Sequence, residues 1–258
     1  PNVLSLNADS MIEPAEADMV WSVGKKSAVR VHLASGRSID CSLEHKLRKP
    51  QGWEAAQNLV AGDRIAIARN LPAKLSSESP MTDAELILLG HLIGDGSYIS
   101  GQPLRYTTAS DYNSESVKAA AHDLGSVVKR YEGRGNWHQL LISGNGNRWN
   151  PKGVGKFLKS LGIFGQRSAD KRVPTRVFEQ TNDQIALFLR HLWATDGSVT
   201  LSKSGRVRIY FSSISSGLIN DISMLLLRFG VVARKRHVVA KGSHWFTLDV
   251  SGAEQQMS

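Results

Sequence analysis

The sequence predicts an α+β protein in which an all-β N-terminal domain precedes a larger domain made of two related α+β halves. Two observations predict this division. Short strand-like segments separated by turns fill residues 1–73, and one succession of helices and strands occurs twice within residues 83–258. Residues 74–82, in a stretch rich in serine and proline, are expected to be a linker. With 258 residues, 41% of them hydrophobic, the chain is long enough and apolar enough for two globular domains.

The N-terminal domain is expected to contain β-hairpins. Residues 28–33 and 38–40 flank a turn at Gly36, where a glycine can adopt the positive φ of a tight hairpin. A short helical turn is expected over residues 54–59. Residues 64–68 alternate between apolar and polar side chains, which predicts a last strand.

Each half of the larger domain is expected to begin with a capped helix. Residues 82–85 and 181–184 have the pattern of a capping box, in which a threonine accepts a backbone N–H and the fourth residue reaches back to the cap. The apolar runs 86–93 and 185–194 follow, and both helices end in Asp-Gly. Two helices with matching caps and matching ends indicate an internal repeat.

The remaining elements of the two halves also correspond, and both second helices end at a glycine, Gly125 or Gly230. The corresponding segments are 105–110 with 208–213, 114–124 with 217–229, 126–130 with 231–235, and 136–144 with 244–252. We therefore expect the order helix, strand, strand, helix, strand, strand (αββαββ) in each half. The halves span about 83–178 and 179–258, and a pseudo-two-fold axis relates them.

Asp95 and Asp196 end the two repeated helices, where the negative end of the helix dipole disfavours a carboxylate. If the helices pack side by side, both acids and the last helix carbonyl groups converge into an oxygen-rich site suited to Mg²⁺. The small residues Gly90, Gly94 and Ala194 would permit such close packing. The alternative is that each aspartate only begins an Asp-Gly turn. This alternative explains a single Asp-Gly more readily than the occurrence of Asp-Gly at the ends of both helices.

Residues 88–96 (LLGHLIGDG) and 189–197 (LRHLWATDG) resemble the two LAGLIDADG motifs of homing endonucleases. The resemblance implies that Asp95 and Asp196 bind divalent metal ions, with help from backbone carbonyl groups of Gly94 and Thr195. Each acid would then serve one strand of DNA, so that the enzyme makes a double-strand break.

Two further features bear on this resemblance. Residues 166–174 resemble the lysine-bearing block between the motifs, which implies that Lys171 lowers the pKa of a nucleophilic water or offsets developing charge. The second motif has His191 and Thr195 where small residues are usual, which predicts a looser helix contact there. His91 and His191 are expected on packing or exposed faces rather than as metal ligands.

The charge of the chain favours a polyanionic partner. The net charge is +9, and only one unit of it lies in residues 1–73, where nine basic and eight acidic side chains nearly balance. Double-stranded DNA is the expected partner of the larger domain. Strand residues that alternate onto one face are the expected contacts to phosphates and base edges: Arg105, Lys129, Tyr131, Arg206, Arg208, Tyr210, Arg234 and Arg236.

The N-terminal domain resembles the splicing (Hint-type) domain of inteins, most nearly of inteins in replicative DNA helicases. The resemblance rests on residues 36–45 (GRSIDCSLEH) with 52–53 and 62–65. It implies that Ser42 holds the scissile amide and that His45 donates a proton to the amide nitrogen. The flanking host segments (exteins) would be partners in cis. Cys41 is expected to be a buried strand residue. Because it is the single cysteine of the sequence, an internal disulfide is excluded.

Because the sequence has no long apolar run and no signal-peptide pattern, we expect a cytoplasmic protein that is associated with the nucleoid when it acts on DNA. We also expect a monomer, and we expect the chain to be part of a longer intein. The chain opens with Pro1 rather than Cys or Ser, it has no His-Asn pair, and a second catalytic lysine would fall beyond Ser258. The alternatives are a free-standing homing endonuclease, and a catalytically inactive protein of the same fold that binds DNA or matures RNA.

Overall fold

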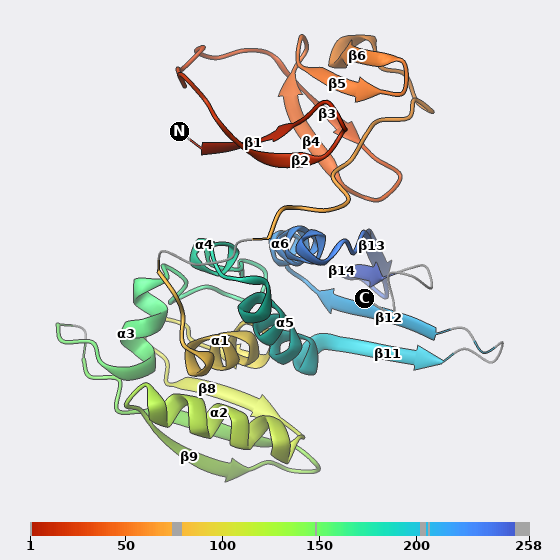
Figure 1. The fold of residues 1–258 in the computed structure, drawn as a ribbon. Helices are drawn as coiled ribbons and strands as arrows, with labels where there is room; N and C mark the ends of the chain where they lie inside the picture. Colours follow the sequence, from red (N-terminus) through yellow and green to blue (C-terminus); the bar gives the residue numbers. More distant parts are fainter. Residues whose placement is uncertain (1, 74–78, 148, 202–204, 206, 251–258) are drawn as a thin grey trace.

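A computed structural model of the chain describes residues 2–73, 79–147, 149–201, 205 and 207–250 (Figure 1). Residues 2–73 contain three antiparallel hairpins and a short 3-10 turn, η1 (Ala56–Asn58). The hairpins are β1 (Asn2–Leu6) with β2 (Ile12–Glu16), β3 (Ala28–His32) with β4 (Ser38–Ser42), and β5 (Lys46–Lys49) with β6 (Gly52–Ala55). The all-β character of this part is therefore found in the structure.

The hairpin predicted around Gly36 is confirmed, since β3 pairs with β4 and Gly36 has a φ of 80°. Cys41 is buried in β4, as expected. The strand predicted over residues 64–68 is wrong. Ala66 donates a backbone hydrogen bond to Arg48, but this is a single contact, and alternation of polarity does not make a strand without a paired neighbour.

The two α+β halves have the predicted αββαββ order. The first half contains α1 (Asp83–Asp95), β7 (Gly96–Ser97), β8 (Leu104–Thr108), α2 (Asp111–Asp123), β9 (Val127–Glu132) and β10 (His138–Ser143). The second contains α5 (Asn182–Asp196), β11 (Gly197–Leu201), β12 (Val207–Ser213), α6 (Ser216–Leu226) with the 3-10 turn η2 (Leu227–Phe229), β13 (Ala233–Ala240) and β14 (Ser243–Val250). The short helices α3 (Gly153–Ser160) and α4 (Thr175–Phe178) connect the halves.

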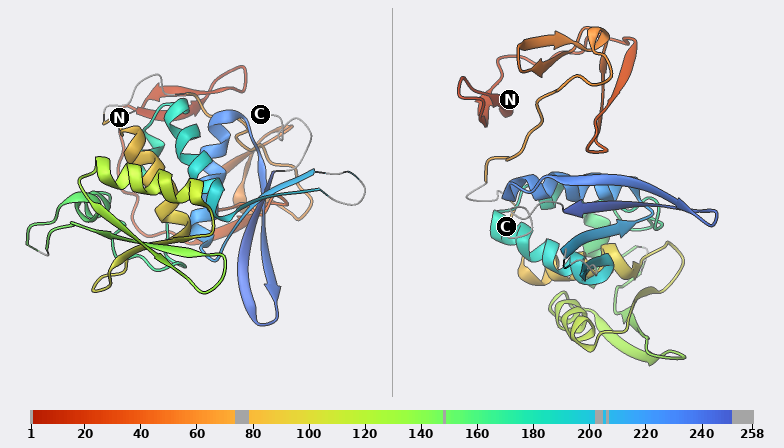
Figure 2. Two further views of the ribbon diagram at one scale, coloured as in Figure 1. Left: turned by 90° about the horizontal axis from the view of Figure 1, so that it is seen from below. Right: turned by 90° about the vertical axis from the view of Figure 1, so that its right-hand side faces the viewer.

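Each half forms a four-stranded antiparallel sheet with the same strand order, β7-β8-β10-β9 and β11-β12-β14-β13. In the left view of Figure 2 the helices of both halves lie next to one another, and the two sheets extend to either side. One hydrophobic core joins the helices to the inner faces of both sheets, through Leu89, Leu92, Leu140, Phe188, Phe211 and Leu248 among others. In the described part of the chain no helix has the length and apolarity needed to cross a membrane.

Local signals in the sequence set the ends of the helices. Both predicted capping boxes are present: Thr82 and Glu85 at α1, and Thr181 and Gln184 at α5. The glycines that follow the second helices, Gly125 and Gly230, have φ values of 78° and 71°, a conformation that favours glycine.

The pairing of the strands corrects part of the predicted repeat. Gly96 lies opposite Tyr106, and Gly197 lies opposite Phe211, so Tyr106 and Phe211 are equivalent positions. Arg105 therefore corresponds to Tyr210, not to Arg208, and the predicted alignment of these strands was wrong by two residues. A shift by two keeps every side chain on its own face of the sheet, so the polarity pattern alone could not reveal it.

Helices α1 and α5 pack with their backbones close together (Figure 1). A Cβ atom built on Gly90 would lie 2.9 Å from the backbone nitrogen of Leu192, and one on Gly94 would overlap the side chain of Thr195. The looser contact predicted at His191 and Thr195 is not observed. His191 is buried at this interface, and Thr195 fills the space that Gly94 leaves.

Candidate active site and nucleic-acid interface

Asp95 and Asp196 end helices α1 and α5, and because the helices lie side by side both carboxylates line one pocket of about 380 Å³. The other side chains around this pocket come from the segment between the halves and from the second sheet: Ser168, Lys171, Ser212, Ser213, Ile214 and Trp245. The two acids therefore lie in the same pocket, as the sequence predicted.

The two carboxylates lie in an unfavourable electrostatic environment. Burial by the surrounding helix ends and the nearby negative charge of Asp196 raise the pKa of Asp95 to about 6, whereas Lys171 acts in the opposite direction. Burial also raises the pKa of Asp196, again against the influence of Lys171. A positive charge in the pocket would relieve both acids.

Lys171 is buried, with 6% of its surface exposed, and its ammonium group lies at the end of α1. The Nζ atom donates hydrogen bonds to the carbonyl oxygens of Gly94 at 2.7 Å and Gly96 at 2.9 Å, with a longer contact of 3.4 Å to Leu92. Burial lowers the pKa of Lys171 to about 8, although the negative charges of Asp196 and Asp95 oppose that change. The lysine predicted from the sequence therefore lies beside both acids.

The backbone on either side of Lys171 is tied to helix α6. The Lys171 carbonyl accepts a hydrogen bond of 2.7 Å from Ser215, the N-cap residue of that helix. Arg172 donates to both oxygens of Asp221 at 2.7 and 2.8 Å, and the backbone of Val173 donates to the same carboxylate. Contacts with the second half thus hold the backbone of Lys171 in place, whereas the ammonium group of Lys171 donates its hydrogen bonds to carbonyl groups of the first half.

The donor set of this pocket fits a hard divalent cation. Mg²⁺ is usually bound by one or two carboxylates, with water and substrate phosphates completing its octahedron. The described residues contain no group of three or more His, Cys, Asp or Glu side chains that could hold a metal, so Asp95 and Asp196 are the carboxylates available here. The carbonyl of Gly94, predicted as a ligand, accepts a hydrogen bond from Lys171; Thr195 lies beside it on α5.

A buried polar chain joins the two halves one helical turn away from the acids. His91 Nε2 lies 3.0 Å from His191 Nδ1, and His91 Nδ1 lies 3.1 Å from the hydroxyl of Tyr106. Burial, together with His191, lowers the pKa of His91 to about 4, so the pair is neutral at physiological pH. Both histidines lie on the packing face of their helices, and their contact with each other was not predicted.

In the first half, the predicted DNA contacts Arg105, Lys129 and Tyr131 share the sheet face opposite α2, because Leu104 and Tyr106 turn inward. Lys129 Nζ lies 5.1 Å from the centroid of the Tyr131 ring. Arg105 and Lys129 form no ion pair with any described residue, so both charges are available to a ligand.

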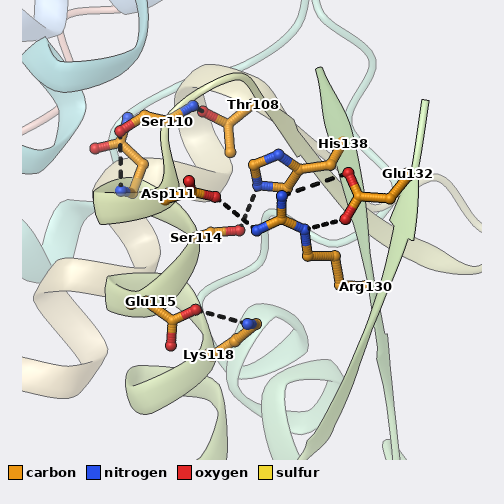
Figure 3. A network of polar contacts seen from close by, with 10 residues as sticks. Thr108, Ser110, Asp111, Ser114, Glu115, Lys118, Arg130, Glu132 and His138 are labelled. Carbon is orange, nitrogen blue, oxygen red and sulfur yellow. Dashed lines mark hydrogen bonds and ion pairs between the residues drawn. The ribbon is translucent and has the colours of Figure 1, made fainter. Parts of the chain in front are cut away.

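The helix side of the same sheet carries a separate polar network (Figure 3). Arg130 donates to Asp111 through Nη1 at 2.6 Å and to Glu132 through Nε at 2.6 Å, which ties the first turn of α2 to β9. Ser114 Oγ lies 2.6 Å from His138 Nε2, and both groups are buried. This network holds α2 on the sheet and leaves the opposite face open.

In the second half, Arg208, Tyr210, Arg234 and Arg236 lie on the face opposite α6. Arg206 lies outside the described residues. Asp249, which was not predicted from the sequence, is a buried acid on β14 that pairs with Arg208 at 2.6 Å and with Arg236 at 3.4 Å. Asp249 lies on the middle strand of β12-β14-β13, and this strand order is known only from the structure.

The residues predicted for splicing lie in the turn after β4. Ser42 is the last residue of that strand, and its carbonyl accepts a hydrogen bond of 3.1 Å from the backbone of His45. His45 is exposed and lines a pocket of about 780 Å³ with residues of β5 and the segment 64–70. Ser42 does not line this pocket, and no contact joins the two side chains.

Comparison with known proteins finds a family match for part of the chain. Residues 183–256 match the model of the LAGLIDADG-like domain. Over 98% of its length the chain is 36% identical to the replicative DNA helicase DnaB of Rhodothermus marinus, and over 81% it is 28% identical to the protein RecA of Mycobacterium bovis. The chain spans only 28% and 26% of the length of these two relatives.

Among solved structures, the chain is similar to the homing endonuclease I-DmoI in complex with DNA and Mn. The sequences are 16% identical, the TM-score is 0.47, and the match covers 68% of this chain and 93% of that one. The match to the LAGLIDADG-like domain thus falls on the second α+β half of the protein, which begins with α5.

Proposed function

We propose that residues 83–258 are a site-specific homing endonuclease that hydrolyses both strands of DNA with Mg²⁺. One observation carries the proposal: Asp95, Asp196 and the buried ammonium group of Lys171 meet in one pocket at the ends of paired helices. A protein that only binds DNA or RNA needs none of these groups, and keeping two crowded carboxylates costs it stability.

The residues of the pocket would have two roles in hydrolysis, metal binding and stabilisation of negative charge. Asp95 and Asp196 would hold the divalent ion, which when bound polarises the scissile phosphate and activates water. Lys171 is mostly protonated at neutral pH, since its pKa is about 8. Its fixed ammonium group would offset the negative charge that develops on the phosphate, without reorganisation of the site.

The two sheets would position the DNA. Their open faces carry Arg105, Lys129 and Tyr131 in one half and Arg208, Tyr210, Arg234 and Arg236 in the other. Trp245 of β14 lies on the open face and also lines the acidic pocket. A duplex bound along both open faces would therefore place its backbone next to Asp95 and Asp196.

We further propose that the chain is part of an intein, with residues 1–73 as the N-terminal part of a splicing domain and 74–82 as the linker. The supporting observation is that matches over 98% and 81% of this chain cover about a quarter of two relatives with different names, a replicative DNA helicase and the protein RecA. A segment shared by proteins that are otherwise unalike is typical of an inserted element. Ser42 and His45 would act on the N-terminal splice junction, with the exteins as partners in cis.

A variant that separates binding from chemistry tests the endonuclease. Asp95→Asn preserves the shape of the side chain and removes its charge, so we expect double-strand cleavage to fall by at least about 100-fold while DNA affinity changes by less than about threefold. Cleavage should also stop when EDTA removes the metal. Equal loss of binding and cleavage in Asp95→Asn would mean that the acid is structural, and the proposal would fail.

A further inference from the structure

Asp249 is a buried charge on a surface that has no structural need for one. It lies on the open face of the second sheet, yet only 4% of its surface is exposed, because Arg208 and Arg236 cover it from the two neighbouring strands. Thr247 adds a contact of 3.4 Å to one carboxylate oxygen. Burying a carboxylate is costly even when it is paired.

The first half shows what the fold itself requires at this place. Arg234 faces Asp249 across the ladder, and Lys129 faces Leu141 in the same way, so Leu141 is the equivalent residue. Leu141 is apolar and half-buried. The fold therefore tolerates a hydrophobic residue at this position. The acid in the second half is explained instead by its ion pairs with Arg208 and Arg236.

Asp249 holds these arginines by one edge only. One carboxylate oxygen accepts a hydrogen bond of 2.6 Å from Arg208 Nε, and the other forms an ion pair of 3.4 Å with Arg236 Nε; among the described residues neither arginine has a further hydrogen bond. The guanidinium of Arg208 also lies over the Tyr210 ring, 4.4 Å from its centroid. About half of each arginine side chain is exposed, so the terminal amino groups remain available to a ligand.

Structural arginines in this protein are used differently. Arg172 gives both its Nε and a terminal nitrogen to Asp221, and Arg130 is bonded on two sides by Asp111 and Glu132 (Figure 3). In both cases the fork of the guanidinium is occupied by protein. In the described part of the chain the terminal nitrogens of Arg208 and Arg236 have no such partner, while Asp249 and the Tyr210 ring orient Arg208 and the ion pair with Asp249 holds Arg236.

We infer that Asp249 is a positioning residue that presents Arg208 and Arg236 to guanine edges in the DNA half-site bound by the second sheet. A fixed guanidinium fork matches the O6 and N7 acceptors of guanine in the major groove, and two N–H donors contact one base. The half-site under the first sheet, where Arg105 and Lys129 have no such acid, would depend less on guanine. The inference rests on the proposed DNA-binding function.

Selection from a randomised duplex library, scored by sequencing of the bound fraction, tests the inference. For the wild type we expect guanine to be preferred by about 5- to 100-fold at positions in one half-site. Asp249→Asn should reduce that preference to about twofold or less at those positions only, while affinity for unrelated DNA stays equal or rises because a negative charge is lost. Asp111→Asn, which removes a carboxylate from Arg130 on the opposite face, is the matched control and should leave the preferences unchanged.

Arg208→Lys provides a second arm that leaves Asp249 in place. It keeps the positive charge but not the fork, so base preference should fall at one position without loss of non-specific affinity. If the base preferences were unchanged in both Asp249→Asn and Arg208→Lys, the inference would fail while the proposed function would stand. A loss of affinity that is uniform over all sequences in these variants would have the same meaning. A wild-type protein without any sequence preference would overturn the proposed function as well.

Discussion

Asp95→Asn is expected to stabilise the protein in the absence of metal, although it should abolish double-strand cleavage. The pKa of Asp95 is raised from 3.8 to about 6 by burial and by Asp196, so the folded protein disfavours the charged form. Without screening, this shift corresponds to about 3 kcal/mol. Because Asp95 is exposed on one side, solvent reduces the figure, and we expect the variant to gain about 1 kcal/mol, or about 2–4 °C in melting temperature.

The pH dependence of this effect has a definite sign. Between pH 3.8 and about 6 the folded state binds more protons at Asp95 than the unfolded state does, so stability falls as pH rises through this window. The cost is complete above pH 6, and it disappears below about pH 4. The advantage of Asp95→Asn should therefore be largest at pH 7–8 and absent at pH 4.

Urea denaturation of both proteins in EDTA, at pH 4, 6 and 8, measures the difference. Asp83→Asn is the matched control, since it makes the same substitution at the other end of α1, where the helix dipole favours an acid. It should lower stability by about 0.3–1 kcal/mol. Adding Mg²⁺ should then stabilise the wild type but not Asp95→Asn. If Asp95→Asn were less stable than the wild type at pH 8, the account of a crowded acidic pocket would be refuted.

Three further predictions concern packing, capping and the lysine. Gly90→Val should lower the unfolding free energy by about 2–3 kcal/mol in urea, because its Cβ would meet the backbone of α5; an unchanged midpoint would mean that the helices do not meet there. Thr82→Ala should cost about 1 kcal/mol and Thr82→Ser almost nothing, and equal losses in thermal unfolding would exclude a capping role. Cleavage should decline above about pH 8 as Lys171 loses its proton, and a rate that keeps rising to pH 10 would show that the neutral amine is the active form.

The parts of the fold that follow from local chemistry were predictable. The capping threonines Thr82 and Thr181, the glycine at the end of α2 and the Asp-Gly that ends α1 are each recognised from a few neighbouring residues. The repetition of these local signals then gave the two halves and the meeting of the two acids. Here a long-range contact could be predicted because two local patterns agreed.

Contacts between segments distant in the chain were not predictable in the same way. The alignment of Arg105 with Arg208 failed because a two-residue shift leaves the polarity of a strand unchanged. The neutral pair of His91 and His191, and the carbonyl groups that receive Lys171, depend on how the helices and the connecting segment are placed in space. No spacing in the sequence encodes those distances.

Strand-resolved cleavage of a supercoiled plasmid tests the central claim most directly. The plasmid would carry an uninterrupted replicative DNA helicase gene, which is the target expected for the proposed endonuclease. With Mg²⁺ the wild type is predicted to produce linear DNA, Asp95→Asn and Asp196→Asn at most nicked circles, and the double variant no product. Linear DNA from either single variant at the wild-type rate would contradict the assignment of one acid to each strand.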